Sequence, residues 1–368
     1  MNWILSTNKT WGHLEKQFDW VAAMRDVPQD ALYHAEGNVA VHTQMVLEAL
    51  TSDIYYKALP ASQQELLWTA ALLHDVEKRS TTITEQDGRI TSHGHARKGE
   101  YTSRQVLYHL GMPFQQREQV AALVRLHGLP LWLMEKTDPV KALLGASLRI
   151  DMPLLALIAR ADVSGRICND QQQLLERIDF FQAYCEEVGC WQGPKSFASD
   201  LARFVYFHKE ESHPEYIPFD DLRSDVIMLS GLPGMGKDRY IKKHYADWPV
   251  VSLDDIRRQH KFKPDDITAT GQAVQMAKEQ AREYLRKGER FIWNATNITR
   301  QMRSQWIDLF ATYKARVRII YIEVPHREWV RQNYNREHVV PENVLMRLLR
   351  KLEVPLPYEA HSVEYIVE

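Results

Sequence analysis

Apolar residues recur at helical spacing through most of the first half of the chain, from Val39 to about Cys190. The two clearest stripes consist of Ala40, Met45, Val46, Leu47 and Leu50, and of Leu66, Leu67, Ala70, Ala71 and Leu73. Residues three or four apart share one face of a helix, so each stripe predicts an amphipathic helix. The same spacing recurs at residues 104–109, 118–126, 141–148, 154–161 and 174–187. No segment of this half alternates as a strand does, and we predict an all-helical bundle.

The helical pattern breaks between residues 188 and 225, where Gly189, Gly193, Pro194, Pro214 and Pro218 fall. Glycine and proline are the strongest breakers of regular structure, although residues 198–207 keep a helical pattern. We therefore expect a first domain at residues 1–190, a linker with one short helix at 191–223, and a second domain at 224–368.

Short apolar runs alternate with helical patterns after the linker. The runs at residues 226–230, 250–253, 291–293 and 317–324 predict buried strands, and the stretches between them at 238–245, 272–286 and 301–313 predict helices. Strands that alternate with helices are typical of a parallel sheet covered by helices. The predicted fold class is thus α plus α/β, a helical bundle followed by a domain with a parallel sheet.

Composition places the chain among ordinary globular proteins, with 368 residues, 45% hydrophobic and 26% charged. Its start lacks the pattern of a signal peptide, and no stretch reaches the roughly 20 apolar residues of a membrane span. Three cysteines, Cys168, Cys185 and Cys190, are too few for a disulfide framework. We expect a cytoplasmic protein without a membrane partner.

Charge and histidine content differ between the halves. From Arg223 to the end the chain has 25 basic and 19 acidic residues, although its total net charge is −2. This excess suits a polyanionic partner, but it is equally compatible with an ordinary solvated surface. Seven of the 15 histidines lie between His34 and His127, which directs attention to metal chemistry in the first half.

A glycine-rich segment follows the strand predicted at residues 226–230 and precedes a helix. It contains Gly231, Gly234, Gly236 and Lys237 in the order typical of a phosphate-binding loop. The glycines permit tight turns that direct N–H groups at an anion, and Lys237 would reach the β- and γ-phosphates of ATP or GTP. Asp238 stands where a Ser or Thr usually ligates Mg²⁺; a carboxylate also suits Mg²⁺, directly or through water. The alternative is a strand–turn–helix corner with incidental glycines.

Two acids, Asp254 and Asp255, end the next predicted strand. Ligand sites of parallel sheets lie at the carboxyl ends of the strands, and phosphoryl transfer to a hydroxyl uses an Asp to accept the proton. Asp254 is therefore a candidate catalytic residue. The alternative is that one of the two acids caps the helix that follows, and both roles are compatible.

In the first half, His74 and Asp75 adjoin at the end of an apolar helix, and His42 and Asp162 belong to other predicted helices. Two His and two Asp from different helices of a bundle suit one divalent transition metal, and His95 and His127 are candidates for a second ion. A divalent ion lowers the pKa of water and stabilises charge that develops on a phosphoryl group. Each histidine alone is more simply a core or surface side chain; the combination predicts a metal-dependent phosphoesterase.

The second half resembles the 5′-OH polynucleotide kinases of phage and bacterial RNA repair, through residues 231–238, 254–257, 295–297 and 332–336. The resemblance implies that Asp254 is the general base and that Arg257 contacts the acceptor's phosphate. It also implies that Arg336 lies over the donor phosphates, with Thr296 and Asn297 near the substrate. Two residues depart from the pattern. Ala295 replaces an Asp of that family. Gln332 stands where the family has the first of its lid arginines, which lie over the donor phosphates, and Arg331 is a substitute from the next position.

The first half resembles the HD phosphohydrolases, most closely the HD domain attached to bacterial tRNA nucleotidyltransferases, over residues 33–167. The motifs are His34-Ala-Glu-Gly, His42-Thr43, His74-Asp75, Gly94-His95 and Ala161-Asp162-Val-Ser-Gly165-Arg166. The resemblance implies that His42, His74, Asp75 and Asp162 bind metal and that Lys78 contacts a phosphate. The head that carries nucleotidyltransferase activity has no counterpart before Tyr33.

The two domains in this order resemble the bacterial HD–polynucleotide kinase end-healing enzymes. That implies hydrolysis of a 2′,3′-cyclic or 2′-phosphate in one half and phosphorylation of a 5′-OH RNA or DNA end in the other, with a ligase as a partner in repair. Two other functions stay open. One is a small-molecule or nucleoside kinase fused to a nucleotidase, and the other is a non-catalytic RNA-binding protein gated by nucleotide.

Overall fold

The computed structural model describes residues 3–262, 266–335 and 339–367. The chain forms two compact units, Met1–Lys195 and Ser196–Glu368. Each unit has its own core and is considered by itself below.

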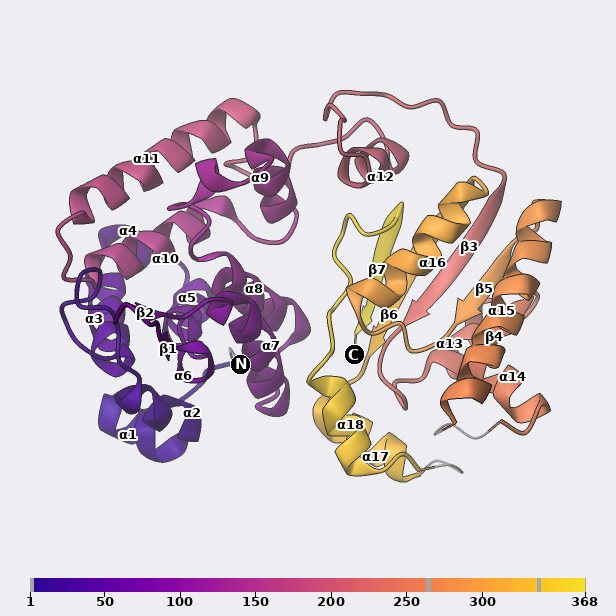
Figure 1. The fold of residues 1–368 in the computed structure, drawn as a ribbon, viewed down its shortest axis with the longest axis horizontal. Helices are drawn as coiled ribbons and strands as arrows, with labels where there is room; N and C mark the ends of the chain where they lie inside the picture. Colours follow the sequence, from indigo (N-terminus) through magenta and orange to yellow (C-terminus); the bar gives the residue numbers. More distant parts are fainter. Residues whose placement is uncertain (1–2, 263–265, 336–338, 368) are drawn as a thin grey trace. The chain divides into compact units, whose positions relative to one another are not determined.

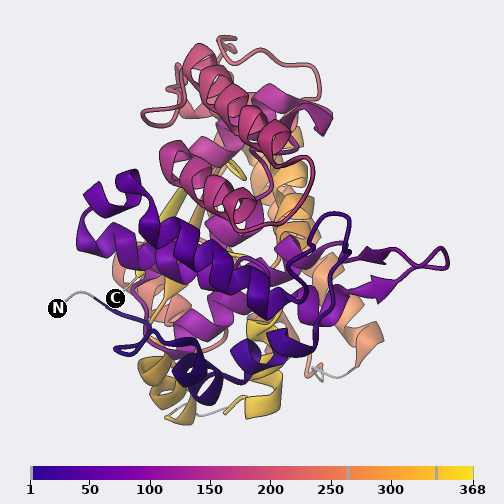
Figure 2. The same ribbon diagram turned by 90° about the vertical axis from the view of Figure 1, so that its left-hand side faces the viewer.

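The first unit is a bundle of helices (Figures 1 and 2). Its helices are α1 Trp11–Gln17, α2 Asp19–Ala22, η1 Ala23–Asp26, α3 Val39–Ser52, α4 Ile54–Ala58, α5 Ala61–Leu73, α6 Lys78–Thr81, α7 His95–His109, α8 Phe114–Leu126, η2 Leu133–Glu135, α9 Pro139–Ser147, α10 Met152–Ser164 and α11 Gln171–Val188. A short antiparallel hairpin, β1 Ile83–Thr84 with β2 Ile90–Thr91, extends from the bundle (Figure 2). Apart from this hairpin, the described residues confirm the predicted helical fold.

Helix α5 is the centre of this bundle. All its residues from Glu65 to Leu73 are buried, and it packs against α3, α8 and α10. A helix that is apolar on all sides is stable only when other helices surround it. Its carboxyl end, where His74 follows, is therefore held inside the bundle.

The second unit contains a parallel sheet of five strands within its described residues, in the order β4-β5-β3-β6-β7. The strands are β3 Ser224–Ser230, β4 Val250–Ser252, β5 Phe291–Asn294, β6 Ala315–Glu323 and β7 Ser362–Val367. The helices are α12 Asp200–His208, α13 Lys237–His244, α14 Leu253–Gln259, α15 Ile267–Lys287, α16 Arg300–Thr312, α17 His326–Tyr334 and α18 Glu342–Leu349. This is the predicted α/β architecture, with β3 at the centre.

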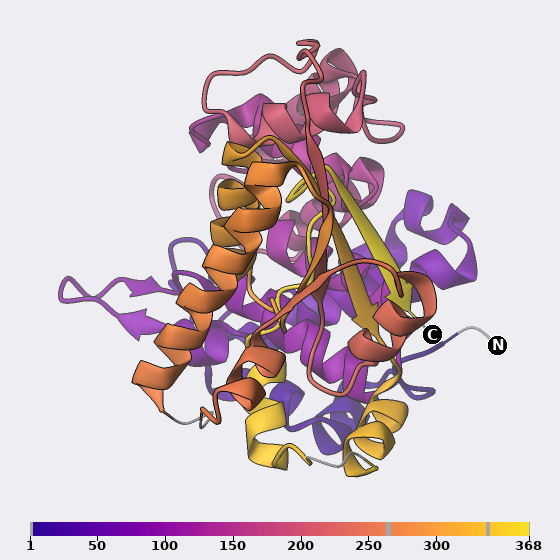
Figure 3. The same cartoon turned by 90° about the vertical axis from the view of Figure 1, so that its right-hand side faces the viewer.

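One face of the sheet packs against α12, α15 and α16 (Figures 1 and 3). Alternate strand residues such as Val226, Met228 and Trp293 point into this core, as the two-residue period of a strand requires. Helix α15 contributes alanines at every fourth position, Ala273, Ala277 and Ala281, which allow a close approach.

Helix α12 is the short helix that we expected in the linker. Its Phe204 belongs to the core of the second unit, and Arg203 donates to the backbone oxygen of His361 at 2.7 Å. The second unit thus includes this helix, and it begins at Ser196 rather than at residue 224.

No single helix within the described residues is long and apolar enough to cross a membrane. Among these residues, one pair of helices, α9 and α10, has the length and composition of a span when the two are taken together, but the pair is bent by 109°. The three cysteines are free.

Candidate metal centre and phosphate-binding loop

Four histidines of the first unit come from separate elements and meet in the bundle. His42 lies in the first turn of α3, which the side chain of Asn38 caps. His74 and His127 directly follow α5 and α8, and His95 is the first residue of α7. His42, His74 and His127 are buried, and His95 is partly exposed.

Each of these histidines has its Nδ1 atom next to an oxygen acceptor. His74, His95 and His127 direct Nδ1 at the backbone oxygens of the residue three positions earlier, at 2.7, 2.7 and 2.8 Å. His42 directs Nδ1 at the carboxylate of Glu36, at 2.9 Å. A ring that donates from Nδ1 carries a lone pair on Nε2, which is the arrangement of a metal ligand.

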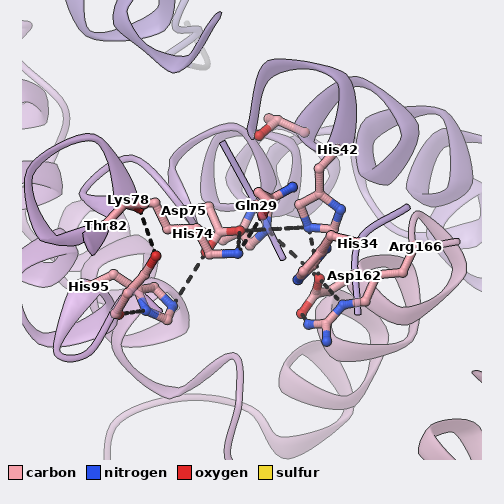
Figure 4. Close-up of polar contacts among 12 residues, drawn as sticks. Gln29, His34, His42, His74, Asp75, Lys78, Thr82, His95, Asp162 and Arg166 are labelled. Carbon is pink, nitrogen blue, oxygen red and sulfur yellow. Dashed lines mark hydrogen bonds and ion pairs between the residues drawn. The ribbon is translucent and has the colours of Figure 1, made fainter. Parts of the chain in front are cut away.

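The Nε2 atoms gather around two aspartates (Figure 4). His42 Nε2 lies 3.1 Å from Asp162 Oδ1 and 3.3 Å from His74 Nε2, and these three residues form one possible ligand set. Asp75, His95 and His127 form a second set, in which Asp75 Oδ1 lies 3.3 Å from His95 Nε2. Asp75 Oδ2 lies 3.3 Å from His74 Nε2, so Asp75 connects the two sets. The structure thus brings together all six side chains that the sequence singled out.

The cluster fits a divalent cation on chemical grounds. Two neutral imidazoles with lone pairs 3.3 Å apart, beside carboxylates, repel one another unless a positive charge lies between them. His95 Nε2 is buried without a hydrogen-bond partner among the described residues. Nitrogen and carboxylate donors together suit a transition metal.

Electrostatics keep the aspartates ionised. Burial raises the pKa of Asp75, but the positive charge of Lys78 and the contacts with His74 outweigh it, and the pKa lies well below its ordinary value. Burial also raises the pKa of Asp162, but the positive charge of Arg166 outweighs it, and this pKa too lies well below its ordinary value. Burial lowers the pKa of His127 to about 4, which keeps that ring neutral at pH 7.

Cationic groups border the cluster. Lys78 Nζ lies 2.8 Å from Asp75 Oδ2 and donates to Gln29 Oε1 at 2.7 Å. Arg166 is paired with both carboxylate oxygens of Asp162. Lys78 and Arg166 line a pocket of about 410 Å³ together with His34 and His95. The pocket is also lined by Asp30 and Asp170, so Lys78 and Arg166, which lie next to the metal cluster, are the two groups in it that suit a phosphate ester.

Two residues of the quoted motifs, to which the sequence argument assigned no role, shape this centre. Glu36 accepts from His34 and His42 through one oxygen, at 2.8 and 2.9 Å. Gly165 allows α10 to approach α3, because a Cβ at this position would lie 2.6 Å from Val46 N. Its backbone oxygen is 3.3 Å from His42 Nδ1.

The glycine-rich loop of the second unit has the expected backbone. Gly231, Gly234 and Gly236 have φ angles of 147°, 86° and 91°, which disfavour other residues. Lys237 opens α13 and donates to the backbone oxygens of Gly231 and Leu232 at 2.8 and 2.9 Å. Its ammonium group thus lies over the loop, where phosphate oxygens would replace these carbonyls as acceptors.

The acid at the end of β4 is exposed and next to cations. The Asp254 side chain is 77% exposed and accepts from Arg257 Nη1 at 3.0 Å. Ser252 rather than either aspartate caps α14, because its hydroxyl accepts from Asp255 N. Helix capping, the alternative role for Asp254, is therefore carried out by another residue. The pKa of Arg258 is raised, first by its hydrogen bond to Asp255 and also by the charges of Asp254 and Asp238.

Asp238 accepts a hydrogen bond from Asn294 Nδ2 at 2.8 Å. Asn294 ends β5, the strand between the loop strand and β4. Its amide therefore orients the carboxylate that we expect to ligate Mg²⁺, a contact that the sequence did not indicate.

The remaining predicted residues differ in their surroundings. The backbone oxygen of Thr296 accepts from Gly231 N at 3.0 Å, and buried Asn297 donates to Leu229 O at 2.7 Å, so both brace the loop. Arg331 lies on α17, 71% exposed and paired with Glu328. Arg336 lies outside the described residues.

Two family models match the chain, each over less than half of its length. Residues 38–163 match the HD domain, and residues 226–355 match an AAA domain. No curated protein matches the chain. A solved structure from Chloroflexus aurantiacus J-10-fl, described as a candidate kinase, is 15% identical with a TM-score of 0.34, over 39% of this chain and 88% of its own.

The fold and the matches define a class of protein. The chain joins an HD domain to a P-loop domain that matches the AAA domain model. The two domains together indicate a bifunctional, nucleotide-related enzyme whose domains use nucleotide and divalent metal.

Proposed function

We propose that this chain heals broken nucleic-acid ends, with one activity in each unit. The observation that supports it is the presence, in one chain, of a His/Asp metal cluster beside a pocket lined by Lys78 and Arg166 and of a phosphate-binding loop near an exposed aspartate. The first acts on a phosphate at a 3′ end, the second on a hydroxyl at a 5′ end.

In the first unit, His42, His74 and Asp162 would hold one divalent ion and Asp75, His95 and His127 another. Such an ion supplies acidification of water and polarisation of a phosphoryl group. Lys78, between Asp75 and Gln29, binds a non-bridging oxygen of a 2′,3′-cyclic or 2′-phosphate. The Nδ1 contacts hold the imidazole rings in one tautomer throughout the reaction.

In the second unit, the loop from Gly231 to Lys237 binds the phosphates of ATP or GTP, and Asp238 serves as a ligand of Mg²⁺. Asp254 accepts the proton of the 5′-OH as that oxygen bonds to the γ-phosphorus. The bond from the γ-phosphorus to the bridging oxygen breaks, and the nucleoside diphosphate leaves. Arg257, paired with Asp254, contacts the acceptor's phosphate, and Thr296, Asn297, Arg331 and Arg336 complete this site.

The test uses an oligoribonucleotide with a 5′-OH and a 2′,3′-cyclic phosphate, γ-labelled ATP or GTP, and a series of divalent metals. We expect label at the 5′ end and loss of the cyclic phosphate. Asp75→Ala should abolish only the phosphoesterase and Lys237→Ala only the kinase, so each variant is the other's control. Absence of 5′ label with every donor and metal contradicts the polynucleotide kinase.

The choice of acceptor separates this proposal from a small-molecule kinase. Nucleosides and 5′-OH oligonucleotides of RNA and DNA, offered at equal concentration, compete for the same donor. Preference for the oligonucleotide supports end healing, and it makes a ligase the expected partner, because both products suit one. Tight nucleotide binding without turnover would instead support the non-catalytic alternative.

A further inference from the structure

The pocket beside the metal cluster has two kinds of wall. Lys78 and Arg166 are the cationic groups of one side, where the rings of His34 and His95 also lie near the cluster. Tyr33, Ile90, Trp132 and Leu174 add aromatic and apolar surface to the same pocket. A simple phosphate needs only the cationic side, so the apolar surface indicates a ligand with a planar, weakly polar part.

Trp132 is the largest of these apolar side chains, and it is held in place. It is 38% exposed, which is high for a tryptophan. The guanidinium carbon of Arg177 lies 4.6 Å from the ring centroid, and Arg177 Nη1 donates to Leu131 O at 3.2 Å. A Cβ on Gly128 would lie 3.5 Å from Trp132 Cδ1, so the backbone also packs against the ring. Arg177 and the backbone at Gly128 thus support the indole, and Trp132 also lines the pocket.

The segment that carries Trp132 also carries His127. The two residues are five positions apart, and the intervening chain forms a turn after α8 in which Trp132 N donates to Gly128 O at 3.2 Å. The same turn therefore supplies one candidate metal ligand and one wall of the pocket.

Gln29 contacts Lys78 on the cationic side of the pocket. An ammonium group only donates, so the contact with Lys78 Nζ at 2.7 Å fixes the amide oxygen of Gln29 toward Lys78. The amide nitrogen then faces away, and it is buried without a partner among the described residues. Because that nitrogen has almost no accessible surface, it does not reach a ligand in the pocket, and Gln29 acts there by holding Lys78 in place.

From these features we propose that the pocket receives the terminal nucleoside of the substrate, with Trp132 as the surface on which its base stacks. The inference rests on the proposed phosphoesterase function and adds to it the surface that holds the base of the nucleotide substrate. Stacking on an aromatic ring tolerates every base, since each has a π face. Trp132 is thus a specificity residue for nucleotides that does not select one base.

Binding rather than turnover is the test, so that failure of catalysis does not obscure the result. Isothermal titration of the metal-loaded full chain compares a non-hydrolysable 2′-phosphonate analogue of a nucleoside 2′-monophosphate, in which carbon replaces the ester oxygen, with the matching phosphonate of ribose, which lacks the base. Loss of one stacked base changes affinity by about tenfold or more. We expect the wild type to bind the nucleotide tighter by about that factor, and Trp132→Leu to remove the difference.

Two variants complete the design. Trp132→Phe should restore preference for the nucleotide, because it keeps an aromatic face. Tyr55→Leu, an exposed aromatic of the same unit that does not line the pocket, should leave it unchanged. Equal binding of both ligands by the wild type, or undiminished preference in Trp132→Leu, overturns the inference. Hydrolysis of the cyclic phosphate, measured separately, tests the proposed function alone.

Discussion

At the scale of single residues, one carboxylate orients two histidines of the candidate metal centre. Glu36 Oε1 accepts from His34 and His42, and its second oxygen accepts from Ile167 N at 2.9 Å. Burial alone raises the pKa of Glu36, but these three hydrogen bonds outweigh it and lower that pKa. An ionised acceptor at Nδ1 makes Nε2 of His42 a stronger metal ligand.

Glu36→Gln should therefore weaken metal binding while the fold persists. The amide has nearly the same shape but no charge, and loss of such a partner lowers metal affinity about 10–100-fold. Titration of the metal-free chain with Mn²⁺ or Ni²⁺ in a calorimeter measures it. Kinase activity of the same variant is the control and should not change. Wild-type metal affinity in this variant would show that Glu36 only holds the backbone near Ile167.

Gly231→Ala should destabilise the second unit and abolish nucleotide binding. A Cβ at residue 231 would lie 2.5 Å from Ile322 O, and the φ angle of 147° is itself strained for alanine. Gly236→Ala is the matched control, since its φ is also positive but nothing lies within 4 Å of the added atom. We expect a loss of several kcal/mol for the first and about 1 kcal/mol for the second. Urea unfolding of both variants measures the difference.

The sequence predicted the residues that would contact metal or phosphate better than it predicted the residues that position those side chains. His74 and Asp75 stand out because a polar pair ends an apolar helix, and Lys237 because three glycines precede it. Glu36, Gln29 and Asn294 do not, because their partners are distant along the chain: Glu36 pairs with Ile167 and Gln29 with Lys78. Such contacts follow from helix packing and strand order, which no local pattern contains.

At the scale of elements, a buried ion pair fixes α16 to the chain that leads into β7. Arg303 donates to both oxygens of Glu359, at 2.6 and 2.9 Å, and to the backbone oxygens of Asn297 and Glu353. Arg303 is completely buried, and Glu359 is almost so. Through Asn297 the pair also supports the phosphate-binding loop.

Arg303→Met should destabilise the second unit by about 3–5 kcal/mol, because it leaves the Glu359 carboxylate buried without its partner. The control is Lys314→Met, which removes an exposed pair with Asp221 and should cost less than about 1 kcal/mol. Adding Glu359→Gln to Arg303→Met should recover part of the loss. Chemical denaturation of the three variants tests this, and equal effects of the two single changes would contradict it.

Helix α12 and the chain before β7 meet at a buried histidine. The His361 ring stacks on Phe204 with centroids 4.1 Å apart, and its Nδ1 accepts from Val317 N at 3.0 Å. Burial, helped by the charges of Arg316 and His208, lowers the pKa of His361 to about 4. The unfolded chain keeps the ordinary value of 6.5 for this group.

Between pH 6.5 and about 4, the unfolded state therefore binds a proton at residue 361 that the folded state does not. The stabilisation is fully present above pH 6.5 and is lost as the pH falls toward 4. The free energy of unfolding of the second unit should decrease over this interval by up to about 3 kcal/mol. His361→Gln, which keeps an acceptor for Val317, should show a shallower dependence. An identical slope in both proteins would assign the effect to other groups.

The elements that the sequence did not predict are those in which buried and exposed residues alternate only weakly along the chain. Strand β7 lies at the edge of the sheet and is only partly buried, so its residues show no sharp alternation. The short helix α12 was found, but its attachment to the second core depends on contacts of Phe204 and Arg203 with residues far along the chain. By contrast, β3 and β6 are buried almost throughout and appeared as apolar runs.

At the scale of the whole molecule, two units with separate cores carry two different candidate ligand sites. A ligand stabilises only the structure to which it binds, by about 4 kcal/mol when its concentration is a thousand times its dissociation constant. For domains of this size, each kcal/mol raises the melting temperature by about 2–4 °C. The units should therefore respond separately to metal and to nucleotide.

Differential scanning calorimetry of the full chain, freed of metal with a chelator, provides the measurement. Mn²⁺ should raise the transition of the first unit by about 10 °C, and a non-hydrolysable GTP or ATP analogue with Mg²⁺ should raise that of the second. Asp75→Ala should remove the first shift and Lys237→Ala the second, and each variant should keep the other shift. If one ligand raises both transitions equally, or either variant loses both shifts, then the two sites are coupled and the units do not act independently.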